Sequence, residues 1–397
     1  MKLRYHIFLL AVAILAFQAC DDAANPVLEN AYYLNEAASG SLRKVILNEI
    51  DGGDVSATVR SGRKLDADVK VRLTLSQEAL DDYNALNGTD FRMLPASSHD
   101  FVECETVIKA GQSMSERLDI HVKPYTEEMQ ASGIKYALPI SISSVSDDGL
   151  LLDVKKTMIY SFEQVIVTSG FQINAMSSVW RPLANPLYSN TYTLELRVAP
   201  RGLDRENEAF FMVYPYQEAN SGLGEIYCRF QKDNSLNIKV HYNENYTWAG
   251  PITKKWYHIA LVCTGDGNLI TYVNGSEVMR ENKPSYATPN CLEKIAFGAA
   301  TSTWHFNSYC YSEVRLWSKV RSQSQIADNM YAVDPASEGL VAYWRCNEGE
   351  GTMLHDCSGN GNDIDLETCL ETVASSTENC WQWMGPVRSD TDELLDL

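Results

Sequence analysis

Apolar and polar positions between residues 255 and 317 form short runs that predict antiparallel strands. Residues 255–263 (KWYHIALVC) and 269–273 (LITYV) are rich in β-branched and aromatic side chains, which favour strands. Asp266-Gly267 separates the two runs, and Asn274-Gly275 follows the second. Because such pairs readily adopt the positive φ angles of tight hairpin turns, the stretch is predicted to form a three-stranded meander.

The motifs in this stretch occur in an order that resembles the laminin-G-like, concanavalin A-type jelly-roll domains. They are W-x-H-I-A-L from Trp256, D-G-x-L, Y-V-N-G, I-x-F-G from Ile295, and E-V-R-L-W ending at Trp317. The resemblance extends from Phe171 to about Trp383 and implies a β-sandwich of two packed sheets. Such sandwiches serve as lectins, as protein binders and as some glycosidases, so the resemblance alone does not name a ligand.

The first half of the chain also has strand-like runs, with one helical interruption. Residues 45–50 and 69–75 have the strand pattern. After Ser76, a residue type that caps helix N-termini, apolar side chains recur at helical spacing until Asn87-Gly88. Strand-like runs resume between residues 101 and 160. This half is therefore predicted to be a β-sandwich with a short helix, and it resembles the immunoglobulin-like sandwiches.

The sequence from Glu78 to Pro95 (EALDDYNALNGTDFRMLP) resembles an uncharacterised N-terminal module of Bacteroidetes surface lipoproteins. In those proteins the module precedes glycan-binding or glycan-cleaving domains, which implies a spacer or platform role here. The whole chain is predicted to be all-β. A linker over residues 20–29 precedes an N-terminal sandwich over 30–165, and a concanavalin A-like sandwich follows over 171–397.

The N-terminus has the pattern of a secretory signal. Basic residues precede an uninterrupted apolar run, residues 7–17, that is too short to span a bilayer. The run leads to Ala19-Cys20, which resembles a bacterial lipoprotein box and implies that residues 1–19 are a signal peptide and that Cys20 carries a lipid. Asp21-Asp22 resembles the acidic export tag of Bacteroidetes surface lipoproteins. We expect an outer-membrane lipoprotein, exposed at the surface and anchored by its lipid alone.

The net charge excludes two classes of partner, and the cysteine content bears on disulfide formation. The formal net charge of −19 argues against nucleic acid and anionic membrane surfaces, because phosphate binding needs a clustered basic face and the sequence shows none. Of the ten cysteines, eight lie between Cys228 and Cys380. A location outside the cytoplasm would permit disulfides among them, and buried free thiols are the alternative.

Loops rich in aromatic and amide side chains are the predicted ligand site. Aromatic rings stack against the apolar C–H faces of sugars, and amides and carboxylates hydrogen-bond the hydroxyl groups. Residues 243–248 (NENYTW) and 303–307 (TWHFN) have this composition and are predicted to be loops. The alternative for such rings is packing beneath their own loop, whereas Trp256 and Trp317 lie in strand patterns and are predicted to be core. The candidate ligand-binding residues are Asn243, Asn245, Tyr246, Trp248, Trp304 and His305.

Metal binding and catalysis have weaker sequence support. Asp356, Asn360 and Asn362 could ligate calcium through oxygens, as in some laminin-G-like domains, although the acidic ladder of an EF-hand loop is missing. No other cofactor is indicated. Glycosidases of this fold need two neighbouring carboxylates, commonly as Glu-x-Asp-x-x-Glu, and no strand predicted in the second half carries that string. The strings H-E-x-x-H and G-x-S-x-G are also missing from the sequence.

These observations lead to three hypotheses. The first is a lipid-anchored surface protein that binds an oligosaccharide or polysaccharide without cleaving it, with the first domain holding the second away from the membrane. The second is an adhesion or assembly module with a surface protein as partner. The third is a divergent glycoside hydrolase with two carboxyl groups in one cleft. A groove with exposed rings would favour sugar, and a broad flat apolar patch would favour protein.

Overall fold

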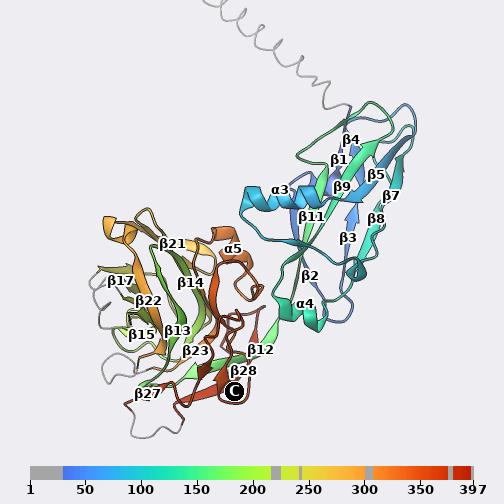
Figure 1. Cartoon of the computed structure of the whole chain (residues 1–397). Coiled ribbons are helices and arrows are strands. Elements are labelled where there is room, and N and C mark those ends of the chain that lie inside the picture. Colours follow the sequence, from blue (N-terminus) through green and yellow to red (C-terminus); the bar gives the residue numbers. More distant parts are fainter. Residues whose placement is uncertain (1–29, 216–224, 241–243, 300–306, 374–378, 395–397) are drawn as a thin grey trace, which may run out of the picture.

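The computed structural model describes residues 30–215, 225–240, 244–299, 307–373 and 379–394. Figure 1 shows two bodies built mainly from strands, the first coloured blue to blue-green and the second green to red. The fold is all-β with a few short helices, as predicted. None of the helices in these ranges is long and apolar enough to cross a membrane. The nine cysteines in these ranges are free thiols.

The first body contains a six-stranded, a three-stranded and a two-stranded sheet. Sequence alternation decides the faces of β5 (Val69–Leu75): Val69, Val71 and Leu73 are buried, and Lys70 and Arg72 are exposed. The other elements are β1 (Ala31–Leu34), β2 (Leu42–Leu47), β3 (Gly53–Ala57), β4 (Val59–Ser61), β6 (Arg92–Met93), β7 (Cys104–Ile108), β8 (Leu118–Val122), α4 (Glu127–Ser132), β9 (Tyr136–Val145), β10 (Leu150–Leu151) and β11 (Thr157–Gln164).

The helix predicted after Ser76 is α3 (Gln77–Asn87). The Ser76 hydroxyl accepts a hydrogen bond from Ala79 N at 3.1 Å, which satisfies one of the free N–H groups at the helix start. Gly88 ends the helix with a φ of 63°, a conformation that glycine adopts without strain. The apolar stripe places Leu80 in the interior, where it is fully buried.

The second body is a sandwich of an eight-stranded and a seven-stranded sheet. The eight-stranded sheet has the order β21-β20-β19-β14-β23-β12-β28, with β24 pairing β23, and the seven-stranded sheet has the order β18-β17-β16-β15-β22-β13-β27. The predicted meander is β19–β20–β21, and Asn274 and Gly275 turn its second hairpin with φ angles of 48° and 74°. The elements are β12 (Val167–Ile173), β13 (Ser177–Ser189), β14 (Thr191–Pro200), β15 (Glu208–Tyr214), β16 (Ile226–Phe230), β17 (Leu236–Val240), β18 (Glu244–Trp248), β19 (Tyr257–Thr264), β20 (Asn268–Val273), β21 (Ser276–Asn282), β22 (Asn290–Gly298), β23 (Tyr309–Trp317), α5 (Gln323–Asp328), β24 (Leu340–Trp344), β25 (Met353–Leu354), β26 (Ile364–Asp365), β27 (Leu370–Thr372) and β28 (Trp381–Arg388).

Aromatic side chains fill the space between the two sheets. Phe297 of β22 has edge-to-face contacts, at centroid distances of 5.3 to 6.5 Å, with Phe171, Phe211, Tyr311 and Trp344. The predicted core residues Trp256 and Trp317 are each 2% exposed and lie in smaller clusters outside this main core.

The connection between the two bodies is already part of a sheet. Strand β12 begins at Val167, inside the stretch predicted to be the connection, because Val167 and Thr168 pair with Arg388 and Val387 of β28. The pairing register then shifts between Thr168 and Gly170. The second body therefore begins directly after β11, the last strand of the first.

The first body contacts the side of the sandwich that carries α5 (Figure 1). Ser322, the N-cap of α5, donates its hydroxyl to Gly88 O at 2.7 Å. Arg92 of β6 pairs with Asp334 at 2.5 Å. Helix α5 itself packs Ile326 against the outer face of β19 and β20. The eight-stranded sheet thus faces the first body, and the seven-stranded sheet lies on the far side of the sandwich.

Candidate functional site

The outer face of the seven-stranded sheet carries a cleft of about 430 Å³, called here the sheet cleft. Strand alternation creates its lining. In β16 the side chains of Ile226, Cys228 and Phe230 are buried in the core, so Tyr227 and Arg229 lie on the opposite face of the sheet. The described lining residues are Ser178, Asn207, Ala209, Met212, Tyr214, Tyr227, Arg229, Lys239, Ala299 and Glu371.

Two cations contact the Tyr227 ring. Its register partner on β17 is Lys239, whose Nζ lies 5.0 Å from the Tyr227 ring centroid, and the guanidinium carbon of Arg229 lies 5.2 Å from it. Both distances are within cation–π range. Lys239 also pairs with Glu225, and Arg229 Nη1 donates to Asn207 Oδ1 at 3.3 Å. These contacts restrain the ring and both cations.

The protonation states in the sheet cleft follow from burial and neighbouring charge. Burial, together with the charge of Glu225, raises the pKa of Tyr227 to about 12. The phenol therefore stays protonated at neutral pH and can donate or accept a hydrogen bond. Burial lowers the pKa of Arg229, but a guanidinium stays charged at neutral pH because its ordinary pKa is so high.

A second cation–aromatic group forms part of the same face. Lys294 of β22 is the register partner of Tyr214 on β15. Its Nζ lies 3.9 Å from the Trp180 ring centroid and 5.1 Å from that of Tyr214. Burial lowers the pKa of Lys294, and Glu371, 3.8 Å away, acts in the opposite direction. Because Tyr214 and Glu371 line the sheet cleft, the cleft combines half-buried rings with fixed charges of both signs.

Four predicted site residues lie outside the described residues. They are Cys20, Asn243, Trp304 and His305. Asn245, Tyr246 and Trp248 are described and belong to one element, β18.

The loop predicted for residues 243–248 is wrong, because residues 244–248 form β18, the edge strand of the seven-stranded sheet. Every residue of β18 has a register partner on β17. Tyr246 is 9% exposed, packs into the main core and donates its hydroxyl to Glu244 at 2.6 Å. The Trp248 ring packs against the same core and over Gly250. Tyr246 therefore has no open ring face for a sugar, and Asn245 is the exposed member of the set.

The predicted calcium ligands form a self-contained hydrogen-bonded loop. Both carboxylate oxygens of Asp356 accept hydrogen bonds, Oδ1 from Tyr343 N and Ser358 and Oδ2 from Asn362. The Asn360 amide donates to backbone carbonyls of β24. The geometry gives these side chains a role in closing the loop. No group of three or more His, Cys, Asp or Glu residues within the described ranges could hold a metal ion.

Sequence reasoning missed the sheet cleft because its residues belong mainly to strands, whereas ligand-binding residues were expected in loops. A usable signal was present in β16 and β17, where Tyr227, Arg229 and Lys239 occupy the outward positions between buried apolar residues. Single strands often carry such residues on a solvated face. Only the pairing of β15, β16, β17 and β22 brings the aromatic and charged residues together.

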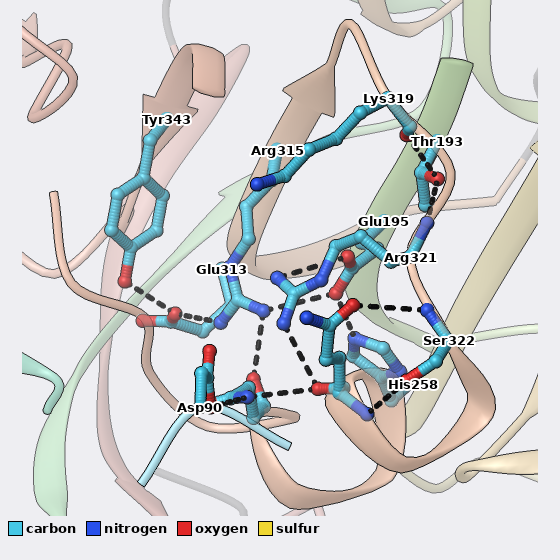
Figure 2. Close-up of polar contacts among 12 residues, drawn as sticks. Asp90, Thr193, Glu195, His258, Glu313, Arg315, Lys319, Arg321, Ser322 and Tyr343 are labelled. Carbon is cyan, nitrogen blue, oxygen red and sulfur yellow. Dashed lines mark hydrogen bonds and ion pairs between the residues drawn. The ribbon is translucent and has the colours of Figure 1, made fainter. Parts of the chain in front are cut away.

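A buried ionic network lies on the other sheet, next to α5 (Figure 2). Glu195 of β14 lies 3.1 Å from Arg315, 3.3 Å from Arg321 and 3.4 Å from His258. Burial alone would raise the pKa of Glu195, but Arg321, His258 and Arg315 outweigh it and hold that pKa at about 2. The Glu195 and Arg315 side chains are both inaccessible to solvent, so this network offers no open surface to a ligand.

Two family models match separate parts of the chain. Residues 28–149 match a model of an N-terminal domain, and residues 177–327 match the model described as the concanavalin A-like lectin/glucanases superfamily. No curated protein sequence matches this chain.

One solved structure agrees with the observed architecture over most of the chain. A protein of Bacteroides ovatus ATCC 8483, named as a candidate carbohydrate binding protein, is 19% identical with a TM-score of 0.51, covering 90% of this chain and 97% of its own. A heptameric SAP-like pentraxin of Limulus polyphemus is 15% identical with a TM-score of 0.33, covering 40% of this chain and 80% of its own. The first likeness shows a common fold, and the second is too distant to carry an argument. The second body is a laminin-G-like domain with the concanavalin A-like sandwich fold.

Proposed function

We propose that this protein binds glycans at the sheet cleft and does not cleave them. The observation that carries the proposal is Tyr227, a half-buried ring in contact with two cations on the outer face of the seven-stranded sheet. A ring held in this way can stack against a sugar with little loss of side-chain entropy. The volume of about 430 Å³ lies within the usual range of small-ligand sites, about 300–1,000 Å³.

The polar groups around the ring suit a polyol. Asn207, Arg229 and Lys239 supply N–H donors, and Glu371 supplies carboxylate acceptors. Sugars present closely spaced hydroxyl groups that both donate and accept. The similarity in fold to the Bacteroides ovatus protein, whose name refers to carbohydrate binding, adds support.

The carboxylate content of the sheet cleft supports binding without turnover. Glycosidases of the common type use two carboxyl groups, separated by about 5–5.5 Å in retaining enzymes and about 6.5–9.5 Å in inverting ones. Among the described lining residues, Glu371 alone carries a carboxylate, and it lies 3.8 Å from Lys294.

The proposal also includes the cell surface as the place of action. The resemblance of Ala19-Cys20 to a lipoprotein box supports a lipid anchor, and Asp21-Asp22 supports export to the outer face of the outer membrane. The first domain would then separate the sheet cleft from the membrane.

Glycan binding can be tested with Tyr227→Ala against a matched tyrosine variant. The protein lacking its signal peptide would be titrated by calorimetry with oligosaccharides, after affinity-gel screening of neutral and acidic polysaccharides. Tyr227→Ala should weaken binding at least about tenfold, which corresponds to about 1.4 kcal/mol. Tyr188→Ala is the control, because Tyr188 is 59% exposed on β13 of the same sheet and does not line the cleft. The proposal would be contradicted if no polysaccharide retarded the protein in the affinity gel, or if Tyr227→Ala and Tyr188→Ala bound the oligosaccharide with equal affinity.

A further inference from the structure

A second cavity, of about 230 Å³, lies where the two bodies meet and is called here the junction cavity. Its walls come from helix α4 of the first body, from the connection at residues 166–168, and from strands β14, β23 and β28 of the second body. Distant parts of the chain therefore converge on one cavity. This cavity is on the side of the eight-stranded sheet, away from the sheet cleft.

Arg197 of β14 gives the junction cavity its chemical character. The side chain is 4% exposed and lines the cavity. Its guanidinium carbon lies 5.1 Å from the Trp256 ring and 4.6 Å from the Tyr331 ring. The two aromatic contacts hold the planar cation in place.

The Nη2 atom of Arg197 is buried and has no hydrogen-bond partner among the described residues. A buried charged donor without an acceptor is costly, and the cost is larger for a cation than for a neutral group. The two rings already engage the guanidinium, so it cannot easily turn to bulk solvent. An acceptor located in the cavity would remove this cost.

Two further arginines line the cavity. Arg345 lines it and donates Nη2 to Ala131 O at 2.5 Å, while its buried Nε has no partner among the described residues. Arg388 also lines the cavity and pairs with Asp390 at 2.8 Å.

The acidic groups near the junction cavity are already engaged or do not accept from Arg197. Glu313 lines the cavity, but its carboxylate is bound by Arg315 and by the Tyr343 hydroxyl, as Figure 2 shows. Asp392 acts on Arg197 through charge alone. Glu127, in the first turn of α4, is the remaining acidic lining residue.

We infer that the junction cavity is a binding site for a small oxyanion, a carboxylate or a sulfate-type group, held by the guanidinium of Arg197 with Arg345 beside it. Guanidinium groups bind planar or tetrahedral oxyanions through paired N–H donors. The cavity volume of about 230 Å³ is large enough for one anionic group and the few atoms bonded to it. Because both bodies contribute walls, the bound anion would also stabilise their contact.

The test compares wild type with Arg197→Met and Arg197→Lys in titrations with sodium acetate and sodium sulfate at constant ionic strength. Calorimetry should detect saturable binding of at least one of the two anions by wild type, and the choice between them identifies the anion class. Arg197→Met should weaken it about tenfold or more, the effect expected for loss of a charge-assisted hydrogen bond. Sulfate raises the melting temperature of most proteins without specific binding. If melting temperatures are also compared, only the part of the increase that is lost in Arg197→Met counts as evidence.

Two controls keep the inference falsifiable. Arg280→Met removes an exposed arginine that pairs with Glu277 and should leave anion binding unchanged. Arg197→Lys keeps the charge over the rings, so anion binding by Arg197→Lys that exceeds binding by Arg197→Met would show that the loss in Arg197→Met is not a loss of folding. Wild type that binds neither anion saturably would overturn the inference, and so would equal affinity of wild type and Arg197→Met. Neither result would affect the glycan proposal, which concerns the other sheet.

Discussion

Glu244 shows how a carboxylate at the sheet edge is kept charged. It accepts hydrogen bonds from the hydroxyls of Tyr246 at 2.6 Å, Tyr286 at 2.9 Å and Ser285 at 3.2 Å, and it pairs with Lys283 at 3.0 Å. Burial alone would raise the pKa of Glu244, but these partners outweigh it and hold that pKa at about 2. The same partners fix the orientation of the inward Tyr246 ring.

Glu244→Gln should lower stability in a pH-dependent way. The folded-state pKa lies below that of an unfolded glutamate, about 4.3, so the unfolded chain binds more protons between these values. The stabilisation by Glu244 is therefore complete above about pH 5 and is lost as the pH falls toward 2. Urea unfolding should give a difference between wild type and variant that is largest at pH 7 and shrinks at pH 3. Glu281→Gln on β21, which shares none of these hydrogen bonds, is the control. A difference of equal size at both pH values would contradict the assignment.

At the scale of elements, the sequence predicted those strands, turns and helices whose formation depends on residues close together in the chain. The β19–β20–β21 meander follows from apolar runs and from Asn274-Gly275, and α3 follows from Ser76, Gly88 and helical spacing. Strand β18 was missed because its inward positions hold Glu244, Tyr246 and Trp248. An edge strand pairs with only one other strand, and when one of its inward residues is also polar, its sequence resembles that of a loop.

The sheet cleft could not be predicted from the sequence for a different reason. Its lining combines residues of β15, β16 and β17 with residues of β13 and β27, and Tyr214 meets Lys294 of β22 only through long-range pairing. No local pattern specifies that register. The predicted laminin-G-like fold defined the scaffold but not the face that carries a site, since many sites occur on one fold.

The edge strand β18 depends on the close packing of Trp248 over Gly250. A Cβ atom at Gly250 would lie 2.0 Å from the Trp248 ring, so Gly250→Ala must displace the ring from the core. We expect a loss of about 1–3 kcal/mol in the free energy of unfolding, typical of overpacking, measured by urea titration. Gly40→Ala is the matched control, because no atom lies within 4 Å of its added Cβ, and it should change stability by about 0.5 kcal/mol or less. Similar losses for both variants would show that the Trp248 contact is not the cause.

At the scale of the whole molecule, the two sheets of the sandwich have different surroundings. The first body contacts the side of the eight-stranded sheet through Gly88 and Arg92, while the sheet cleft is on the seven-stranded sheet. A large ligand could therefore reach the cleft without meeting the first body. This arrangement suits a spacer domain between a membrane anchor and a binding domain.

If Cys20 carries the lipid anchor, a change at Cys20 should alter the cellular location of the protein without altering its affinity for glycans. Cys20→Ala should move the protein from the membrane fraction to the soluble fraction of the producing bacterium, because a lipid chain is the only anchor expected. Protease added to whole cells should then no longer find this protein on their surface. The affinity of the purified protein for its oligosaccharide should stay unchanged, since the sheet cleft is formed by residues 178 to 371. Cys104→Ala, which removes a half-buried thiol on β7, should leave the protein in the membrane fraction. Retention of Cys20→Ala in the membrane fraction would contradict the lipid anchor and leave the glycan proposal standing.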